Sequence, residues 1–122
     1  MRVLLAEDDP HISVIAKMSL EMLAGHKVTV VGDGEAALAE ALTQQYDLIL
    51  LDEMMPKMNG VRVSQAYRAK CPNPRPVIFL SAKSQEADIR EFTENGCGYI
   101  AKPFEPSELS SRIRQLLEDK VA

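Results

Sequence analysis

Residues 48–70 read LILLDEMMPKMNGVRVSQAYRAK and contain the clearest fold signal of the chain. This stretch opens with an uninterrupted apolar run at 48–51, passes through a polar loop, and resumes after the Asn59-Gly60 turn with apolar residues at helical spacing. A short apolar run without alternation is typical of a strand that is buried on both faces, as in a parallel sheet. One strand followed by one helix is therefore the expected unit of this chain.

The same unit recurs along the sequence. Apolar runs predict strands at 3–6, 28–31, 48–51, 77–80 and 99–101. Helical spacing of apolar residues predicts helices at 10–24, 34–43, 60–70, 84–95 and 106–118. This alternation predicts an α/β fold of the (βα)₅ type, a doubly wound five-stranded parallel sheet with the flavodoxin-like order 2-1-3-4-5.

Capping residues and prolines support these boundaries. Asp9-Pro10 and Glu105-Pro106 each place a proline at the first helical position, where its missing N–H is tolerated. Ser84 is the expected cap of the fourth helix, since serine is a favoured N-cap residue. The first helix is expected to gather its inward residues on one side, namely Ile12, Ile15, Ser19, Leu20 and Leu23.

Composition narrows the class of protein. The 122 residues suit a single domain spanning 1–122, and 46% hydrophobic residues can supply its core. A net charge of −4, from 14 basic and 18 acidic residues, argues against direct nucleic-acid binding. No apolar run approaches the ~20 residues that span a bilayer, and no signal segment follows Met1, so a cytoplasmic location is expected. Cys71 and Cys97 are expected to be reduced and to pack as small apolar groups.

Polar residues follow four of the predicted strands. Glu7-Asp8-Asp9 follows the first, Asp52 the third, Ser81 the fourth and Lys102 the fifth. Because the carboxyl ends of parallel strands share one edge of the sheet, these side chains should converge there. Ligands of open α/β sheets bind at that edge, near the point where the strand order reverses.

The acidic residues at this edge predict a metal site. Glu7, Asp8 and Asp52 would place three negative charges together and raise one another's proton affinity, which a divalent cation relieves. The hard oxygen ligands favour Mg²⁺, which keeps coordination positions for phosphate oxygens. Counting from the last strand residue assigns Glu7 and Asp8 to the site and leaves Asp9 as the helix cap; Asp9 in place of Glu7 is the open alternative.

A metal beside an aspartate, a hydroxyl and a lysine suits phosphoryl transfer to the aspartate. A hydrolase with an aspartyl-phosphate intermediate is the alternative from a different class, but it commonly needs an acid two residues after the nucleophile, where this chain has Met54. A flavodoxin-type cofactor binder needs a hydroxyl- and glycine-rich loop after the first strand. The acidic segment 7–9 would repel its phosphate.

At this point the sequence resembles the receiver domain of two-component response regulators over essentially its whole length. The resemblance is carried by four ordered segments: LLAEDD at 4–9, LLDEMMPKMNG at 50–60, FLSA at 79–82 and YIAKPF at 99–104. It implies a phosphoacceptor signalling domain rather than an enzyme acting on a separate substrate. The partners it implies are a sensor histidine kinase or histidine phosphotransfer protein, a downstream protein target or fused output domain, and a phosphorylation-dependent homodimer.

The resemblance also implies roles for individual residues. Asp52 would accept the phosphoryl group, with Ser81 and Lys102 contacting its oxygens. Glu7, Asp8, Asp52 and the backbone carbonyl of Met54 would arrange the metal. Tyr99 would turn inward on phosphorylation, and the changed surface would comprise the helix at 84–95, the strand at 99–101 and the helix at 106–118. A cis bond is implied at Lys102-Pro103.

Overall fold

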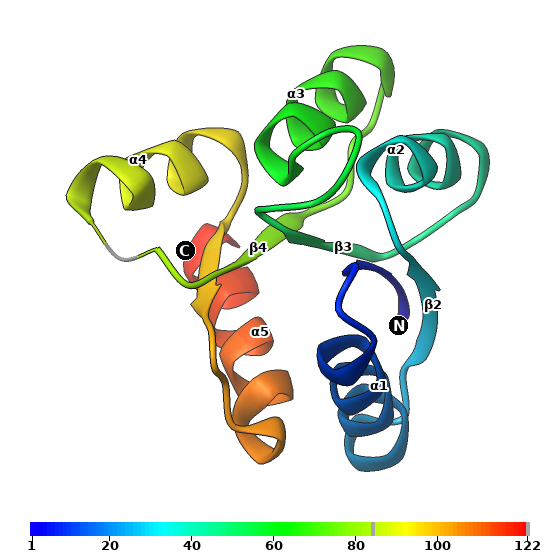
Figure 1. Cartoon of the computed structure of the whole chain (residues 1–122), viewed down its shortest axis with the longest axis vertical. Helices are drawn as coiled ribbons and strands as arrows, with labels where there is room; N and C mark the ends of the chain where they lie inside the picture. The colour runs from blue at the N-terminus through cyan, green and yellow to red at the C-terminus, as the bar shows by residue number, and fades with distance from the viewer. Residues whose placement is uncertain (84, 122) are drawn as a thin grey trace.

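The computed structural model describes residues 1–83 and 85–121, with side chains described as far as Asp119. Strands and helices alternate along the chain (Figure 1). The strands are β1 (Arg2–Ala6), β2 (Lys27–Val31), β3 (Leu48–Asp52), β4 (Val77–Ser81) and β5 (Gly98–Ala101). The helices are α1 (Pro10–Met18), a π-helical segment η1 (Ser19–Leu23), α2 (Gly34–Thr43), α3 (Gly60–Lys70), α4 (Glu86–Asn95) and α5 (Pro106–Val121).

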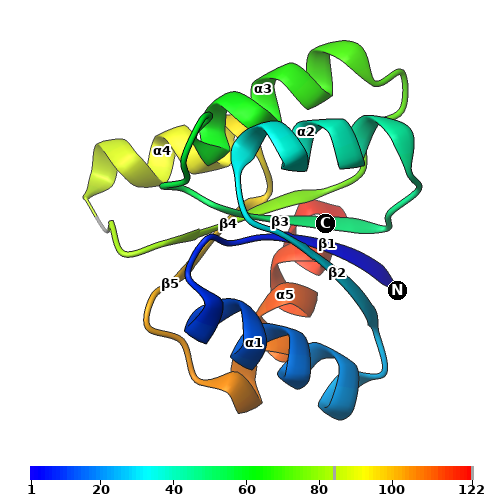
Figure 2. The ribbon, with the colours of Figure 1, turned by 45° about the vertical axis from the view of Figure 1, so that its right-hand side comes forward.

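The five strands form one parallel sheet in the order β2-β1-β3-β4-β5, which confirms the predicted fold. Helices α2, α3 and α4 cover one face, and α1 and α5 cover the other (Figures 1 and 2). Ala6 lies beside Leu51, Asp52 beside Leu80, and Ser81 beside Ala101. The carboxyl ends of β1, β3, β4 and β5 therefore lie side by side.

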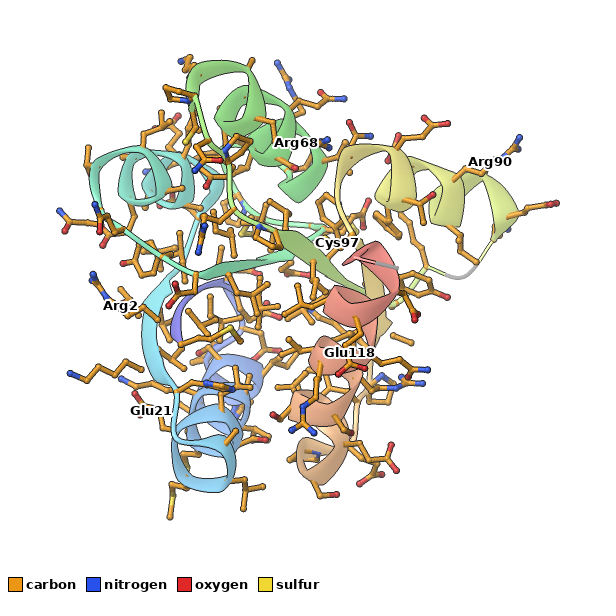
Figure 3. All side chains as sticks on the ribbon, turned by 180° about the vertical axis from the view of Figure 1, so that it is seen from behind. Arg2, Glu21, Arg68, Arg90, Cys97 and Glu118 are labelled. Carbon is orange, nitrogen blue, oxygen red and sulfur yellow. The ribbon has the colours of Figure 1, made fainter. Side chains whose placement is uncertain are left out.

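Each face of the sheet has its own hydrophobic core. Strands β3 and β4 are buried at every position, as their unbroken apolar runs predicted. Phe79 and Phe92 pack in the cluster beneath α2, α3 and α4, with ring centroids 5.2 Å apart. Ile100 and Ile113 belong to the cluster beneath α1 and α5. Figure 3 shows charged side chains, Arg68 and Arg90 among them, directed away from these cores.

The prediction for the first helix was partly wrong. Its last turn is the π-helical segment η1, and the buried residues are Ser13, Ala16, Ser19 and Leu20. Ile15 is 46% exposed and Leu23 is 67% exposed. Small Ser13 and Ala16 thus form the inward face of α1, whereas the larger Ile15 faces outward. The hydroxyl of Ser19 donates a hydrogen bond to the carbonyl of Pro106, which ties η1 to the start of α5.

Two other boundaries differ from the sequence prediction. Helix α4 begins at Glu86, with Gln85 at the N-cap position, while Ser84 lies outside the described residues. Helix α5 continues to Val121 rather than ending at 118. None of the helices in the described part of the chain is long and apolar enough to cross a membrane.

The loop between β3 and α3 closes tightly onto the end of β3. Asn59 caps α3 by accepting a hydrogen bond from the Arg62 amide. The Gly60 amide donates to the Glu53 carbonyl at 3.0 Å. A Cβ atom at Gly60 would lie 2.4 Å from the Asp52 carbonyl oxygen, a distance that no side chain tolerates. Glycine at position 60 therefore lets the loop hold the backbone around Asp52.

Candidate functional site

The sheet brings the polar residues from four strand ends to one edge. Asp52 and Ser81 are the last residues of β3 and β4, and Glu7 and Lys102 directly follow β1 and β5. Glu7 continues the β1 pairing, because its amide donates to the Val31 carbonyl at 3.0 Å. Residues that lie up to 95 positions apart in the sequence, Glu7 and Lys102, thus become neighbours.

Three carboxylates meet at this edge. One carboxylate oxygen from each of Glu7, Asp8 and Asp52 lies within 4.8 Å of the others. Glu7 is 2% exposed and Asp52 is 5% exposed, while Asp8 faces solvent. Asp9 does not join them: its side chain accepts the His11 amide at 2.9 Å and caps α1. The geometry thus favours Glu7 over Asp9 as the third carboxylate.

Lys102 lies between two of these carboxylates. Its Nζ is 2.6 Å from Glu7 Oε1 and 2.8 Å from Asp52 Oδ1. Burial alone would lower the pKa of Lys102, but its hydrogen bond to Asp52 and the adjacent Glu7 carboxylate outweigh this and raise the pKa above its ordinary value. Lys102 is therefore held charged. The Lys102–Pro103 peptide bond is cis, as the resemblance implied.

Glu7 is the carboxylate of the cluster whose pKa is strongly raised. Burial, opposed by Lys102 and reinforced by Asp52, raises its pKa from 4.5 to about 7. Although Lys102 Nζ is close, Oε1 of Glu7 is a buried oxygen that accepts no properly oriented hydrogen bond from the described residues. The sequence predicted repulsion among the acids; the structure makes desolvation of one of them the larger cause.

This shift predicts a pH-dependent stability. Because folded Glu7 binds a proton more tightly than unfolded Glu7, its contribution to stability is complete below pH 4.5 and is lost as the pH rises to about 7. The loss should amount to about 3 kcal/mol in metal-free protein. Glu7→Gln should flatten this decline, which urea unfolding in chelator at pH 5 and pH 8 can measure. Equal pH dependence in both proteins would contradict the assignment.

The other residues that the sequence singled out lie around this cluster. Ser81 is 2% exposed, and its Oγ accepts the Lys83 amide at 3.0 Å. Tyr99 is half-buried and packs against Phe92, with ring centroids 5.5 Å apart. Met54 is 68% exposed and lines the cleft beside the site. Its backbone carbonyl as a metal ligand stays a prediction.

Sequence reasoning missed an ion pair at the mouth of the site. Lys83 Nζ lies 2.7 Å from Glu53 Oε1, across a separation of 30 residues. Both side chains line an open cleft of about 450 Å³ together with Asp8, Met54, Met55, Pro56 and Asn59. Opposite charges directly after Asp52 and shortly after Ser81 were visible in the sequence, but only the adjacent ends of β3 and β4 make them partners.

The donor set of the acidic cluster fits a divalent cation. It consists of hard carboxylate oxygens, one of them a buried oxygen without a proper hydrogen bond, and it borders an open cleft. Mg²⁺ prefers such ligands and retains positions for water or phosphate oxygens. Cys71 and Cys97, which are both free, are not in this cluster.

Comparison with known proteins identifies the family. The sequence profile described as "Response regulator receiver domain" matches residues 3–114. The chain belongs to this family. The receiver domain is similar to the DNA-binding response regulator MtrA of Mycolicibacterium smegmatis, with 37% identity over 95% of this chain and 50% of that protein. It is 42% identical to the transcriptional regulatory protein CpxR of Escherichia coli K12, over 95% of this chain and 49% of that protein.

Solved structures agree with the assignment. A Francisella response regulator receiver domain is 35% identical, with a TM-score of 0.86 and 98% of each chain covered. The receiver domain of a Pseudomonas aeruginosa sensor histidine kinase, described with a magnesium ion coordinated in its active-site cleft, is 32% identical. Its TM-score is 0.83, with 96% of this chain and 97% of that chain covered. The family match makes this chain a signalling domain rather than a classical enzyme. It spans about half the length of the two curated relatives named above.

Proposed function

We propose that this receiver domain accepts a phosphoryl group on Asp52 from the phosphohistidine of a sensor histidine kinase or histidine phosphotransfer protein. The observation that carries the proposal is the position of the Asp52 carboxylate. It lies at the end of β3, with Lys102 at 2.8 Å and two further carboxylates in the same cluster. The same side chains would serve autophosphorylation from small donors and dephosphorylation by water.

The chain supplies the groups that in-line phosphoryl transfer needs. Lys102 holds Oδ1 of Asp52, which leaves Oδ2 to attack phosphorus. The bond from phosphorus to the donor nitrogen or oxygen breaks, the leaving group takes the electron pair, and a phosphorus–oxygen bond forms on Asp52. Lys102 and the Ser81 hydroxyl would stabilise the charge on the transferred oxygens.

Mg²⁺ is the cofactor that the carboxylates support. Glu7, Asp8 and Asp52 would hold it, with the carbonyl of Met54 as the fourth protein ligand. When bound, the cation neutralises the carboxylates and the incoming phosphoryl oxygens. Its ligands are thus the same side chains whose charges are crowded without it.

Phosphorylation of the wild-type domain tests the proposal directly. With millimolar Mg²⁺ and acetyl phosphate, intact mass spectrometry should show one added phosphoryl group, and peptide mapping should place it on Asp52. A chelator should prevent the reaction. Absence of a mass change with both acetyl phosphate and phosphoramidate, or modification of another residue, would overturn the proposal.

Magnesium should also stabilise the folded domain. Since it binds the native cluster only, millimolar Mg²⁺ should add stability in proportion to its saturation, about 1–3 kcal/mol at concentrations well above Kd. Asp8→Asn removes an exposed ligand and should lose most of this gain. Thermal melts with Mg²⁺ and with chelator measure the difference. An equal gain in Asp8→Asn would mean that the ion binds elsewhere.

Phosphorylation would shift the packing of one face. Ser81 would move toward the phosphoryl group, and Tyr99, now half-buried beside Phe92, would turn into the vacated space. We expect a phosphate mimic, beryllofluoride, to move the amide NMR signals of α4, β5 and α5 most. Larger changes in α2 than in these elements would place the output face elsewhere.

The output passes to another protein surface. The relatives named as DNA-binding or transcriptional regulators favour a fused output domain, and a separate protein target or a phosphorylation-dependent homodimer would use the same face. The net charge of −4 supports an output that this domain does not deliver by binding nucleic acid itself. These partners are consistent with the proposal that residues 1–122 form a single domain that acts in the cytoplasm.

A further inference from the structure

The Glu53–Lys83 ion pair lies across the entrance to the candidate phosphorylation site. Glu53 directly follows Asp52, and its amide donates to the Leu80 carbonyl at 2.9 Å, so it stays fixed to the end of the sheet. Lys83 belongs to the segment after β4, where its amide donates to the Ser81 hydroxyl oxygen. The pair therefore joins the two segments that carry Asp52 and Ser81.

The two partners of this ion pair differ in solvent exposure. The Glu53 side chain is 11% exposed, whereas that of Lys83 is 48% exposed. The lysine ammonium is a hydrated point charge on a flexible stem, so Lys83 can exchange one anionic partner for another without leaving solvent. Lys83 also shares the cleft of about 450 Å³ with Asp8. A donor approaching the cluster through that cleft meets the Lys83 ammonium.

From this geometry we propose that Lys83 is a positioning residue for the phosphodonor, and that Glu53 competes with the donor for it. The inference rests on the proposed function, since it concerns how the anion reaches Asp52. In the resting state Glu53 binds the ammonium. An arriving phosphoryl dianion draws Lys83 from Glu53 and gains a cationic contact beside Asp52, in addition to Lys102.

The charges around the cleft explain why this competition should affect the rate of phosphorylation. Glu53 adds a negative charge at the entrance that is not among the three carboxylates that would hold the cation, and this charge opposes the approach of an anion. Lys102 already forms ion pairs, because its Nζ lies 2.6 Å from Glu7 Oε1 and 2.8 Å from Asp52 Oδ1. Among the described residues, Lys83 is the one lysine that lines the cleft, and the carboxylate that it pairs with is Glu53.

Four variants test the proposal in the Mg²⁺-loaded domain with acetyl phosphate. Lys83→Gln should lower the second-order rate of phosphorylation about three- to tenfold, and Glu53→Gln should raise it about threefold. The double variant Glu53→Gln/Lys83→Gln should be slower than Glu53→Gln alone, because it lacks the contact. Lys57→Gln is the matched control: it removes the same charge from the loop between β3 and α3, which also borders the cleft, but Lys57 pairs with Asp33 at 3.7 Å, and its rate should stay near wild type.

Donor charge and salt separate a direct contact from a structural effect. The loss in Lys83→Gln should be larger with doubly charged acetyl phosphate than with singly charged phosphoramidate, and it should shrink in 0.5–1 M salt, where the Debye length is about 3–4 Å. In a crystal structure of the beryllofluoride complex, Lys83 Nζ should contact a fluoride. Retention of the Glu53 contact would contradict the exchange of partners.

Failure of this inference is distinguishable from failure of the proposed function. If wild type is phosphorylated on Asp52 but the double variant is as fast as Glu53→Gln, Lys83 makes no contact with the donor and the inference is wrong. If Lys57→Gln loses as much as Lys83→Gln, the effect is general electrostatics, which also overturns it. If wild type acquires no phosphoryl group, the proposed function itself fails and the inference fails with it.

Discussion

Replacing Asp52 with alanine should abolish phosphoryl incorporation, with residual labelling at least about a hundredfold below wild type, because the nucleophilic oxygen is lost. No neighbouring carboxylate is equivalent to it. Glu7 is buried against Lys102 and has a raised pKa, so it is partly protonated near neutrality, and Asp8 is exposed. Incubation with acetyl phosphate and Mg²⁺, read by intact mass spectrometry, measures the loss.

Asp47→Ala is a suitable control for this experiment. Asp47 directly precedes β3, at the opposite end of the strand from Asp52, and its partners are the Arg2 amide and Arg75. It removes the same type of side chain without touching the cluster and should leave labelling near the wild-type level. Undiminished labelling of Asp52→Ala, with another acid modified, would contradict the assignment of Asp52.

Replacing Lys102 with methionine should destabilise the metal-free domain by about 3–5 kcal/mol at pH 8, the range observed when one partner of a buried ion pair is removed. The reason is that the side chains of Glu7 and Asp52, 0% and 7% exposed, would lose their shared cation. Methionine keeps the length of the side chain, so little packing is lost. Urea unfolding in chelator measures the change.

Low pH and a second substitution should each reduce the destabilisation caused by Lys102→Met. At pH 5 Glu7 is mostly protonated, since its pKa is about 7, and it needs the lysine less, so the destabilisation should be smaller. Glu7→Gln/Lys102→Met should recover part of the lost stability, which a double-mutant cycle quantifies. A loss below about 1 kcal/mol, unchanged by pH, would mean that Lys102 is in effect a solvated surface lysine. Phosphorylation should fall as well, because Lys102 orients Asp52.

Much of the fold was predictable because its signals are local. The unbroken apolar runs of β3 and β4 are short, buried on both faces and flanked by turn residues, so their type and place could be read directly. Helices α2 and α3 begin and end where the apolar spacing predicted, at 34–43 and 60–70, and the structure shows that Asp33 and Asn59 cap them. The inward face of α1 could not be read, because small Ser13 and Ala16 pack inward where large Ile15 was expected.

The strand order and the edge at which Glu7, Asp52, Ser81 and Lys102 meet could be predicted without the structure, because each βα unit has local signals and parallel sheets place the carboxyl ends of their strands at one edge. Whether Glu7 or Asp9 joins the other carboxylates stayed open in the sequence, and the structure places Asp9 as the cap of α1. How these charges pair depends on contacts between distant parts of the chain. Lys102 contacts Glu7 from 95 residues away, and Lys83 contacts Glu53 from 30 residues away. The burial that raises the pKa of Glu7 depends on every element packed around it, and no local pattern encodes that desolvation.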